Sequence, residues 1–148
     1  MLIFYIMKYH LPLIGMLFLG IINTSNAQND FPPEGFMDGS YVVIGRLPDS
    51  NQTYQGTIGV TSSNQVLSMT RVINGQKTIA LGKFETTSEN AQVLKISFES
   101  KGKKYEESCL VSSDLDNYAR VTCYLYQEST KKVGLEVWFS DHGQLEQK

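Results

Sequence analysis

The chain has 148 residues, with 13 Lys and Arg against 15 Asp and Glu, and a formal net charge of −2. This length fits one domain, because domains usually contain roughly 100–150 residues. A slightly acidic chain without a long basic run lacks the positive surface that binds phosphate backbones, so we expect no nucleic-acid binding. The composition, with 2 Cys and 41% hydrophobic residues, also excludes collagen-like, disordered and disulfide-rich chains.

Residues 1–27 have the three-part layout of a secretory signal peptide. Lys8 precedes an apolar run over residues 11–22, and small, polar residues then lead to Ala27. The run has about a dozen residues, whereas a membrane-spanning helix needs roughly 20, which disfavours the alternative of a membrane anchor. We therefore predict a secreted or periplasmic protein that is cleaved after Ala27. Met7 is a more natural start than Met1, because it places Lys8 directly before the apolar run.

Two further boundaries follow along the chain. Residues 28–38 include two consecutive prolines and show no periodicity, so we expect an extended arm. From residue 39 to residue 140 apolar and polar residues alternate with a period of two, which predicts β-strands, and residues 141–148 form a polar tail. The apolar positions of the eight expected strands include Tyr41, Val43 and Leu47; Tyr54, Ile58 and Val60; Leu67 and Met69; Ile79 and Leu81; Leu94, Ile96 and Phe98; Tyr105 and Cys109; Val121, Cys123 and Leu125; and Val133, Leu135, Val137 and Phe139.

Turn-forming residues separate these strands. Asn74-Gly75 is the sharpest signal, because both residues tolerate positive φ and the dipeptide selects a type I′ hairpin turn. The connections are too short for crossover helices, so neighbouring strands should be antiparallel. We predict an all-β fold consisting of a single eight-stranded antiparallel up-and-down barrel, with a β-sandwich as the alternative.

The two cysteines lie in neighbouring strands of this prediction. Cys109 and Cys123 can face each other if their strands pair as a hairpin, and an exported protein meets an oxidising environment in which disulfides persist. We predict a Cys109–Cys123 disulfide that contributes roughly 3 kcal/mol to stability. The alternative is two buried free thiols, which behave as small apolar residues.

The first strand opens Gly39-Ser-Tyr41-Val-Val-Ile-Gly45-Arg-Leu-Pro-Asp and is followed by Tyr54-Gln-Gly-Thr-Ile. This pattern resembles small secreted bacterial proteins of unknown function that carry a G-x-Y-x-V-x-G-x-x-P-D-G-x-x-Y-x-G opening. It is also distantly similar to the lipocalins and the wider calycin group, with Tyr41 standing where lipocalins have a Trp. The resemblance implies a small exported β-barrel or β-meander and supplies no functional residues.

The sequence offers no catalytic constellation. After the leader the only histidine is His142, which lies in the polar tail and is poorly placed to act as a base beside a nucleophile. Glu106 and Glu107 are adjacent on a strand and must point to opposite faces, so they cannot form one acid–base pair. Asp114 and Asp116 have the composition of a turn. We therefore expect no enzyme, no cofactor and no metal site.

Glu136 is the polar residue that most needs an explanation. It lies on the same strand face as Trp138, and two interpretations remain open: a charged outer-wall residue paired with a cation, or a polar anchor inside a cavity, beside Arg120. In the second case Tyr41 and Tyr54 would complete a candidate pocket. Aromatic side chains also pack cores, so the same residues fit a filled barrel.

Two functions remain. The first is a non-catalytic binding protein that holds a small apolar or amphipathic ligand inside the barrel. The second is an exported interaction, adhesion or inhibitor module that contacts a protein partner through its exterior, with the Tyr-rich segment 118–126 and the segment 31–33 as contacts. An open interior of roughly 300 Å³ or more would favour the first, and a filled interior the second.

Overall fold

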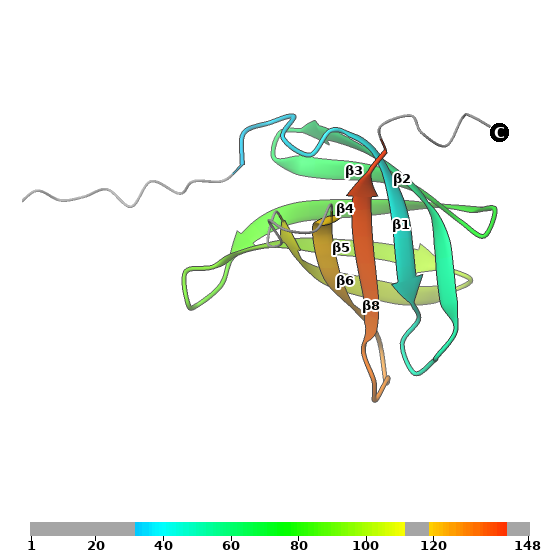
Figure 1. The fold of residues 1–148 in the computed structure, drawn as a ribbon. Helices are drawn as coiled ribbons and strands as arrows, with labels where there is room; N and C mark the ends of the chain where they lie inside the picture. Colours follow the sequence, from blue (N-terminus) through cyan, green and yellow to red (C-terminus); the bar gives the residue numbers. More distant parts are fainter. Residues whose placement is uncertain (1–31, 112–118, 142–148) are drawn as a thin grey trace, which may run out of the picture.

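The structure is a computed structural model that describes residues 32–111 and 119–141. Each strand pairs antiparallel with the next along the chain, and the last pairs with the first to close a barrel (Figure 1). The predicted eight-stranded up-and-down barrel is therefore confirmed, and the β-sandwich is excluded. The strands are β1 (Gly39–Arg46), β2 (Thr53–Ser63), β3 (Val66–Ile73), β4 (Gln76–Thr86), β5 (Gln92–Ser100), β6 (Lys103–Val111), β7 (Ala119–Gln127) and β8 (Gly134–Ser140).

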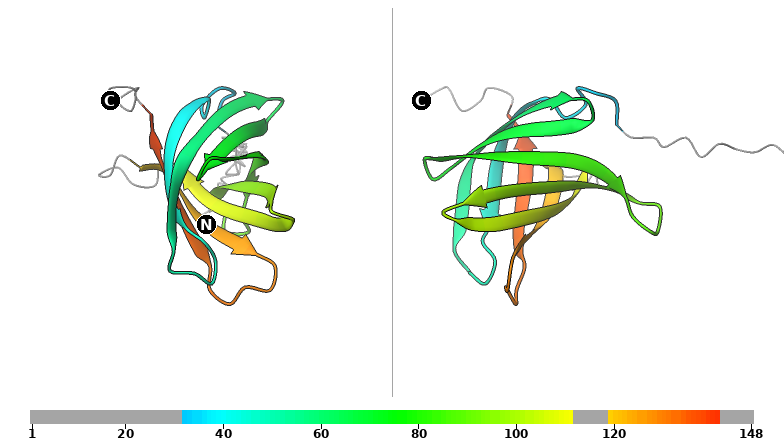
Figure 2. Two further views of the ribbon diagram at one scale, coloured as in Figure 1. Left: turned by 90° about the vertical axis from the view of Figure 1, so that its right-hand side faces the viewer. Right: turned by 180° about the vertical axis from the view of Figure 1, so that it is seen from behind.

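Three hairpins close with two-residue turns. Both central residues have positive φ at Asn74-Gly75, as predicted, and also at Asn64-Gln65 and at Lys101-Gly102. Positive φ at both positions is the requirement of a type I′ turn, whose twist matches that of the strands it joins. Strands β4–β6 cross the barrel at a steep angle to β1 and β8, as Figure 2 also shows, and such a tilt accompanies the closure of a barrel.

Alternate side chains of every strand fill the barrel interior. The buried apolar residues are Met37, Tyr41, Val43, Tyr54, Ile58, Val60, Leu67, Met69, Ala80, Leu94, Ile96, Cys109, Val121, Cys123, Leu125 and Trp138. Most of the predicted apolar positions belong to this set. Because the eight strands form a closed ring, the interior is a packed core at its centre.

The predicted inward face was wrong on two strands. Ile79 and Leu81 of β4 are 55% and 54% exposed, and Ala80 and Gly82 point inward instead. The interior has no room for a side chain at position 82, because a Cβ there would lie 2.6 Å from Met69 Cε. On β8 the exposed residue is Leu135, and Trp138 is the buried one. On β4 large side chains lie outside and small ones inside, which reverses the usual relation between size and burial.

The segment before β1 packs against one end of the barrel. Instead of remaining extended, the chain turns, with Phe36 N–H bonded to Pro33 O and Asp38 N–H bonded to Gly35 O. Met37 is buried, and its carbonyl accepts a hydrogen bond of 2.9 Å from the Tyr41 hydroxyl. The expected extended arm is therefore replaced, over residues 34–37, by turns that add a side chain to the core.

Several expectations lie outside the described residues: the signal peptide at 1–27, the acidic turn with Asp114 and Asp116, and the tail with His142. Within the part of the chain that is described, no helix is long and apolar enough to span a bilayer.

Candidate functional site

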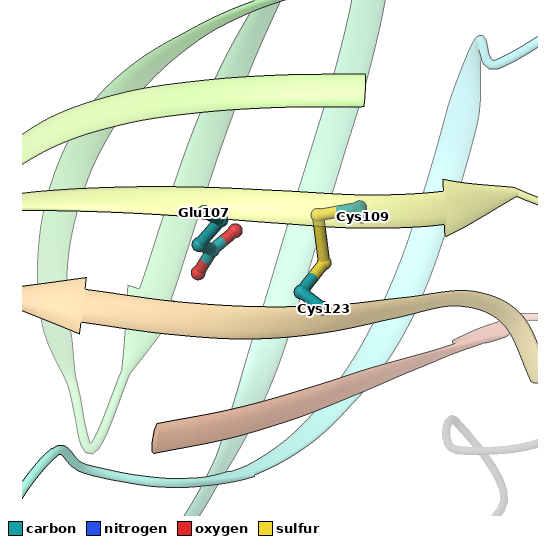
Figure 3. Close-up of side chains that lie close together, drawn as sticks. All are labelled: Glu107, Cys109 and Cys123. Atoms are coloured by element: carbon teal, nitrogen blue, oxygen red, sulfur yellow. A yellow bond between two sulfur atoms is a disulfide. The ribbon is translucent and has the colours of Figure 1, made fainter. Parts of the chain in front are cut away.

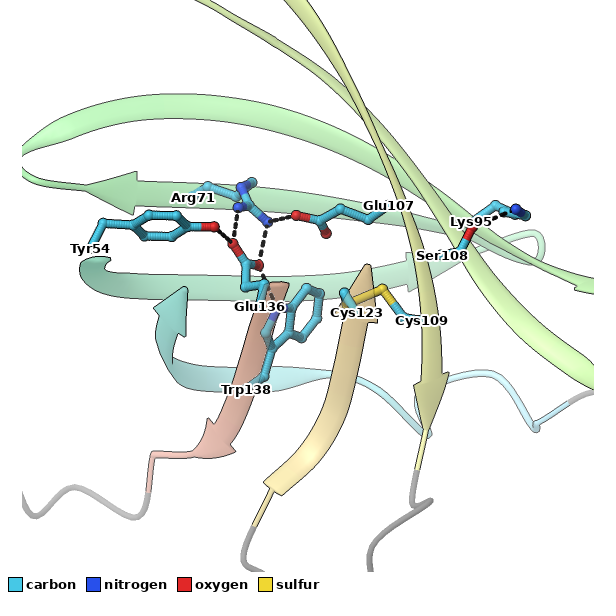
Figure 4. The surroundings of a disulfide bond; sticks show 9 residues. All are labelled: Tyr54, Arg71, Lys95, Glu107, Ser108, Cys109, Cys123, Glu136 and Trp138. Atoms are coloured by element: carbon cyan, nitrogen blue, oxygen red, sulfur yellow. Dashed lines mark hydrogen bonds and ion pairs between the residues drawn. A yellow bond between two sulfur atoms is a disulfide. The ribbon is translucent and has the colours of Figure 1, made fainter. Parts of the chain in front are cut away.

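A buried ion pair joins opposite sides of the barrel interior. Arg71 on β3 donates to both carboxylate oxygens of Glu136 on β8, with Nη1–Oε1 and Nη2–Oε2 distances of 2.9 and 2.6 Å (Figure 4). The two residues are 2% and 0% exposed. This two-pronged geometry is the strong form of an Arg–carboxylate contact, and a buried charge needs such a partner. Glu136 is therefore an inward residue, and its cation is Arg71 rather than Arg120.

Glu136 accepts two more hydrogen bonds from aromatic side chains. The Trp138 indole N–H donates to Oε1 at 2.6 Å, and the Tyr54 hydroxyl donates to Oε2. Each carboxylate oxygen thus accepts one bond from Arg71 and one from an aromatic residue. Four donors compensate the loss of water around the buried charge and fix the carboxylate in one orientation.

The approach of Tyr54 depends on a glycine. Gly45 lies between the two residues in register, paired with Tyr54 on one side and with Glu136 on the other. A Cβ at position 45 would overlap the Tyr54 ring. The missing side chain lets the ring cross β1, so that its hydroxyl can reach β8.

A second carboxylate adjoins the same arginine. Glu107 on β6 is 0% exposed, and its Oε1 lies 3.4 Å from Arg71 Nη1, which is an ion-pair distance without hydrogen-bond geometry. Neither of its oxygens has a hydrogen-bond partner among the described residues. Burial raises the pKa of Glu107 to about 8, the Glu136 carboxylate adds to the rise, and Arg71 opposes it. The raised pKa favours the protonated form of Glu107, and in that form one arginine faces one carboxylate.

The interior cluster consists of Tyr54, Arg71, Glu107, Glu136 and Trp138. In it the pKa values of Arg71 and Tyr54 are raised as well. Burial alone lowers the pKa of Arg71, but the two facing carboxyl groups outweigh it, so the net direction is upward and the guanidinium stays charged. Burial, together with the Glu136 carboxylate, raises the pKa of Tyr54, so its hydroxyl remains a donor.

The disulfide lies next to Glu107. Cys109 on β6 and Cys123 on β7 are direct partners in register, and their sulfurs are bonded, which confirms the predicted pair (Figure 3). The Glu107 carboxylate and the two sulfurs lie within 4.8 Å of one another. Three such groups could suggest a metal centre, but sulfurs bonded to each other are not thiolates and do not act as metal ligands.

A pocket of about 170 Å³ opens at the end of the barrel where β3 turns into β4 and β5 into β6. Arg71 and Tyr54 connect it to the interior cluster. The Arg71 guanidinium lies over the Phe98 ring at 4.4 Å from its centroid, and Phe98 stacks on Tyr105 at 5.1 Å. The pocket is lined by Leu47, Tyr54, Arg71, Ile73, Asn74, Gln76, Thr78, Phe98, Ser100, Lys101, Tyr105 and Leu125.

Larger hollows lie outside the core. One of about 270 Å³ separates the segment before β1 from the turn between β2 and β3, and its lining begins at Pro32, where the described chain starts. Another, of about 470 Å³, lies on the outer face of β4–β6 among exposed charged residues such as Lys83 and Glu106. Neither contains a buried hydrogen-bonded charge, so neither matches the pocket at Arg71 as a specific site.

The candidate pocket residues from the sequence are only partly brought together. Tyr54, Glu136 and Trp138 belong to the interior cluster, and Tyr41 contacts Trp138 with 5.7 Å between ring centroids, near the other end of the barrel. Arg120 is exposed. Of these five residues only Tyr54 lines the pocket.

Sequence reasoning missed Arg71 and Glu107. Arg71 continues the inward alternation of Leu67 and Met69, and Glu107 precedes the inward Cys109 by two residues. The sequence did carry a signal for both residues. Each is a charged residue at an inward position of a strand whose other inward positions are mostly apolar. Glu106, in contrast, is exposed, and the expected separation of Glu106 and Glu107 onto opposite faces is observed.

Comparison with protein-family models, with curated proteins and with solved structures finds no match for this chain.

Proposed function

We propose that the protein is an exported, non-catalytic carrier or sensor that binds one small amphipathic molecule in the pocket at Arg71. The observation that carries the proposal is the contact between an open pocket and the buried guanidinium of Arg71, which two hydrogen bonds to Glu136 hold in place. Ligand sites typically combine apolar and aromatic walls with a few fixed polar groups, and Phe98, Tyr105 and Arg71 supply both kinds.

The size of the pocket limits the ligand. Its volume of about 170 Å³ is below the roughly 300 Å³ at which sites for drug-sized molecules begin. Side chains fill the centre of the barrel, so the open interior expected for a larger ligand is not found in the described part of the chain, and the proposed site is confined to the barrel end. A dry cavity of roughly 150 Å³ is sufficient for benzene. The proposed ligand is therefore a molecule of about one ring, and a long-chain lipid does not fit.

Native mass spectrometry of the protein exported by its host tests the proposal, with the same sample measured under denaturing conditions. The proposal predicts an extra mass on the wild type that leaves on unfolding. Ser100→Phe places a ring in the pocket and should abolish the extra mass, whereas Ser97→Phe places the same ring on the outer face of β5 and should retain it. A bare mass for all three proteins would contradict the proposal.

Export is the second part of the proposal. The leader-like residues 1–27 and the oxidised cysteines support it, because disulfides persist outside the cytosol. It agrees with the resemblance to small exported calycin-like barrels. The exported protein should begin at Gln28, which N-terminal sequencing measures, and an uncleaved N-terminus in the exported fraction would contradict it.

One specific observation favours the alternative function, an interaction module. The outer face of β1, β6, β7 and β8 carries an apolar band in which Tyr124 lies directly opposite Leu135, and Ile44 and Leu110 lie on the adjoining row. Each of the four is at least 39% exposed. Contiguous exposed apolar surface is typical of contact sites between proteins.

A photo-crosslinking residue at position 135 tests this alternative in the exporting cell. A discrete crosslinked protein obtained from position 135, and not from position 81 on β4, which is also a leucine and is more exposed, would support a partner at the band. Identical, diffuse products from the two positions would exclude it.

A further inference from the structure

The wall of the pocket carries positive charge without negative charge. Arg71 and Lys101 are the charged residues among its described lining residues, and none of the others is acidic. Lys101 forms no ion pair with any residue in the described part of the chain. With Glu107 protonated, the charges of Arg71 and Glu136 cancel, and Lys101 leaves the pocket with a net positive charge. Electrostatic complementarity therefore favours an anion.

Arg71 keeps donors for such an anion. A guanidinium has five N–H groups, and the contacts of Arg71 with Glu136 and Glu107 use at most three of them. The remaining N–H groups belong to a side chain that lines the pocket. Lys101 at the rim offers three more donors, and neutral donors at Asn74 and Gln76 complete a polar margin.

The remaining wall suits a flat apolar ring. Phe98 and Tyr105 are stacked with 11° between their planes, and Leu125 and Ile73 add aliphatic surface. The volume of about 170 Å³ admits one ring with a small substituent. An aromatic ring against aromatic side chains adds an attraction beyond burial of its area.

This inference rests on the proposed function and names its ligand class. We propose that the pocket binds a single-ring aromatic carboxylate, whose carboxylate group contacts Arg71 and Lys101 while its ring packs against Phe98. We also propose that a proton on Glu107 is required for tight binding. An ionised Glu107 would compete with the ligand for the same guanidinium.

The residues around Glu107 indicate that its own proton, and not that of another group, controls ligand binding. Arg71 on β3 and Glu136 on β8 are the charged groups that face it, and Tyr54 on β2 also interacts with it. Tyr105 is a further titratable residue on the inward row of β6. In the described part of the chain β4, β5 and β7 direct only uncharged side chains inward, and β1 adds Tyr41, whose pKa burial raises. The ionisation that most changes the charge beside Arg71 between neutral and mildly alkaline pH is therefore that of Glu107.

Isothermal titration calorimetry with three ring-matched probes tests the inference: benzoate, benzamide and benzylamine. Benzoate should bind about tenfold or more tightly than the neutral benzamide, because only benzoate brings a negative charge to Arg71 and Lys101. Benzylamine should be the weakest, because its ammonium group is repelled by both cations. The affinity for benzoate should fall about tenfold between about pH 6.5 and about pH 9, which is within the usual range of coupling between two sites. Glu107→Gln, which stays neutral, should bind benzoate with the same affinity at both pH values.

The outcomes separate the ligand class from the function. Binding of benzamide or benzylamine at least as tight as that of benzoate would overturn the anion assignment and leave the pocket as a ligand site. A fall with pH that persists in Glu107→Gln would overturn the proton requirement alone. Failure of all three probes to bind, together with a bare native mass, would overturn the proposed function and the inference together.

Discussion

Tyr54 and Glu136 are hydrogen-bonded although β1 runs between the strands that carry them. The contact exists because the intervening residue, Gly45, has no side chain, and a Cβ there would overlap the Tyr54 ring. One glycine therefore determines whether the buried carboxylate receives its fourth donor.

Gly45→Ala should lower the free energy of unfolding by about 1–3 kcal/mol, the usual range for overpacking a core. Gly59→Ala is the matched control on the neighbouring strand, because nothing lies within 4 Å of a Cβ at that position. Urea titrations of both variants measure the difference. Equal stability of the two variants would show that the Tyr54 ring is not held where the structure places it.

The two ends of the buried ion pair should differ in their sensitivity to substitution. Arg71→Met leaves Glu136 buried without a cation and should cost about 3–5 kcal/mol. Glu136→Gln should cost less, because Glu107 lies 3.4 Å from the guanidinium and can ionise to replace the lost charge. Chemical denaturation at neutral pH measures both losses. A larger loss of stability for Glu136→Gln than for Arg71→Met would show that Glu107 does not replace the missing negative charge beside Arg71.

Glu107 should make the protein less stable at alkaline pH. Its pKa is about 8 in the folded protein and near 4.5 when unfolded, so between these values the folded state binds more protons and stability falls as pH rises. The slope is at most about 1.4 kcal/mol per pH unit. The stability of Glu107→Gln relative to the wild type should therefore increase from pH 4.5 to pH 8 and level off above it. A constant difference across that window would exclude a raised pKa.

The Cys109–Cys123 disulfide closes a loop with a sequence separation of 14 and should contribute about 3 kcal/mol in the chain-entropy model. Reduction of the wild type should lower its melting temperature, and the double variant Cys109→Ala/Cys123→Ala should melt near the reduced protein. The variant itself should not respond to reductant. An unchanged melting temperature of the reduced wild type would show that the cross-link does not limit unfolding.

The number of strands and their antiparallel order could be predicted because the signals are local. A period-two alternation and a dipeptide such as Asn74-Gly75 depend only on neighbours in the sequence. The cysteine pair also followed from adjacent strands. The inward face of β4 could not be predicted from neighbouring residues. Position 82 has no room for a side chain because Met69, on another strand, occupies the space.

The interior cluster could be predicted only in part, because some of its residues come from strands far apart in the sequence. Glu136 and Trp138 share a strand face and were identified together, but the partner of Glu136 is 65 residues away, on the opposite side of the barrel. Arg120 was the nearer cation in the sequence, and it is exposed. Which inward residues meet across a barrel depends on the stagger of the strands, and the alternation of one strand carries no information on it.

Nitrogen-15 NMR of the folded, oxidised protein during titration with benzoate tests directly whether the pocket at Arg71 binds a ligand. Binding in the pocket predicts that the Arg71 Nε–H resonance and the backbone amides of Phe98 and Ser100 shift with one common affinity, while the outer residues Tyr124 and Leu135 stay unchanged. Shifts confined to β7 and β8, or no shifts at saturating benzoate, would contradict the pocket as the binding site.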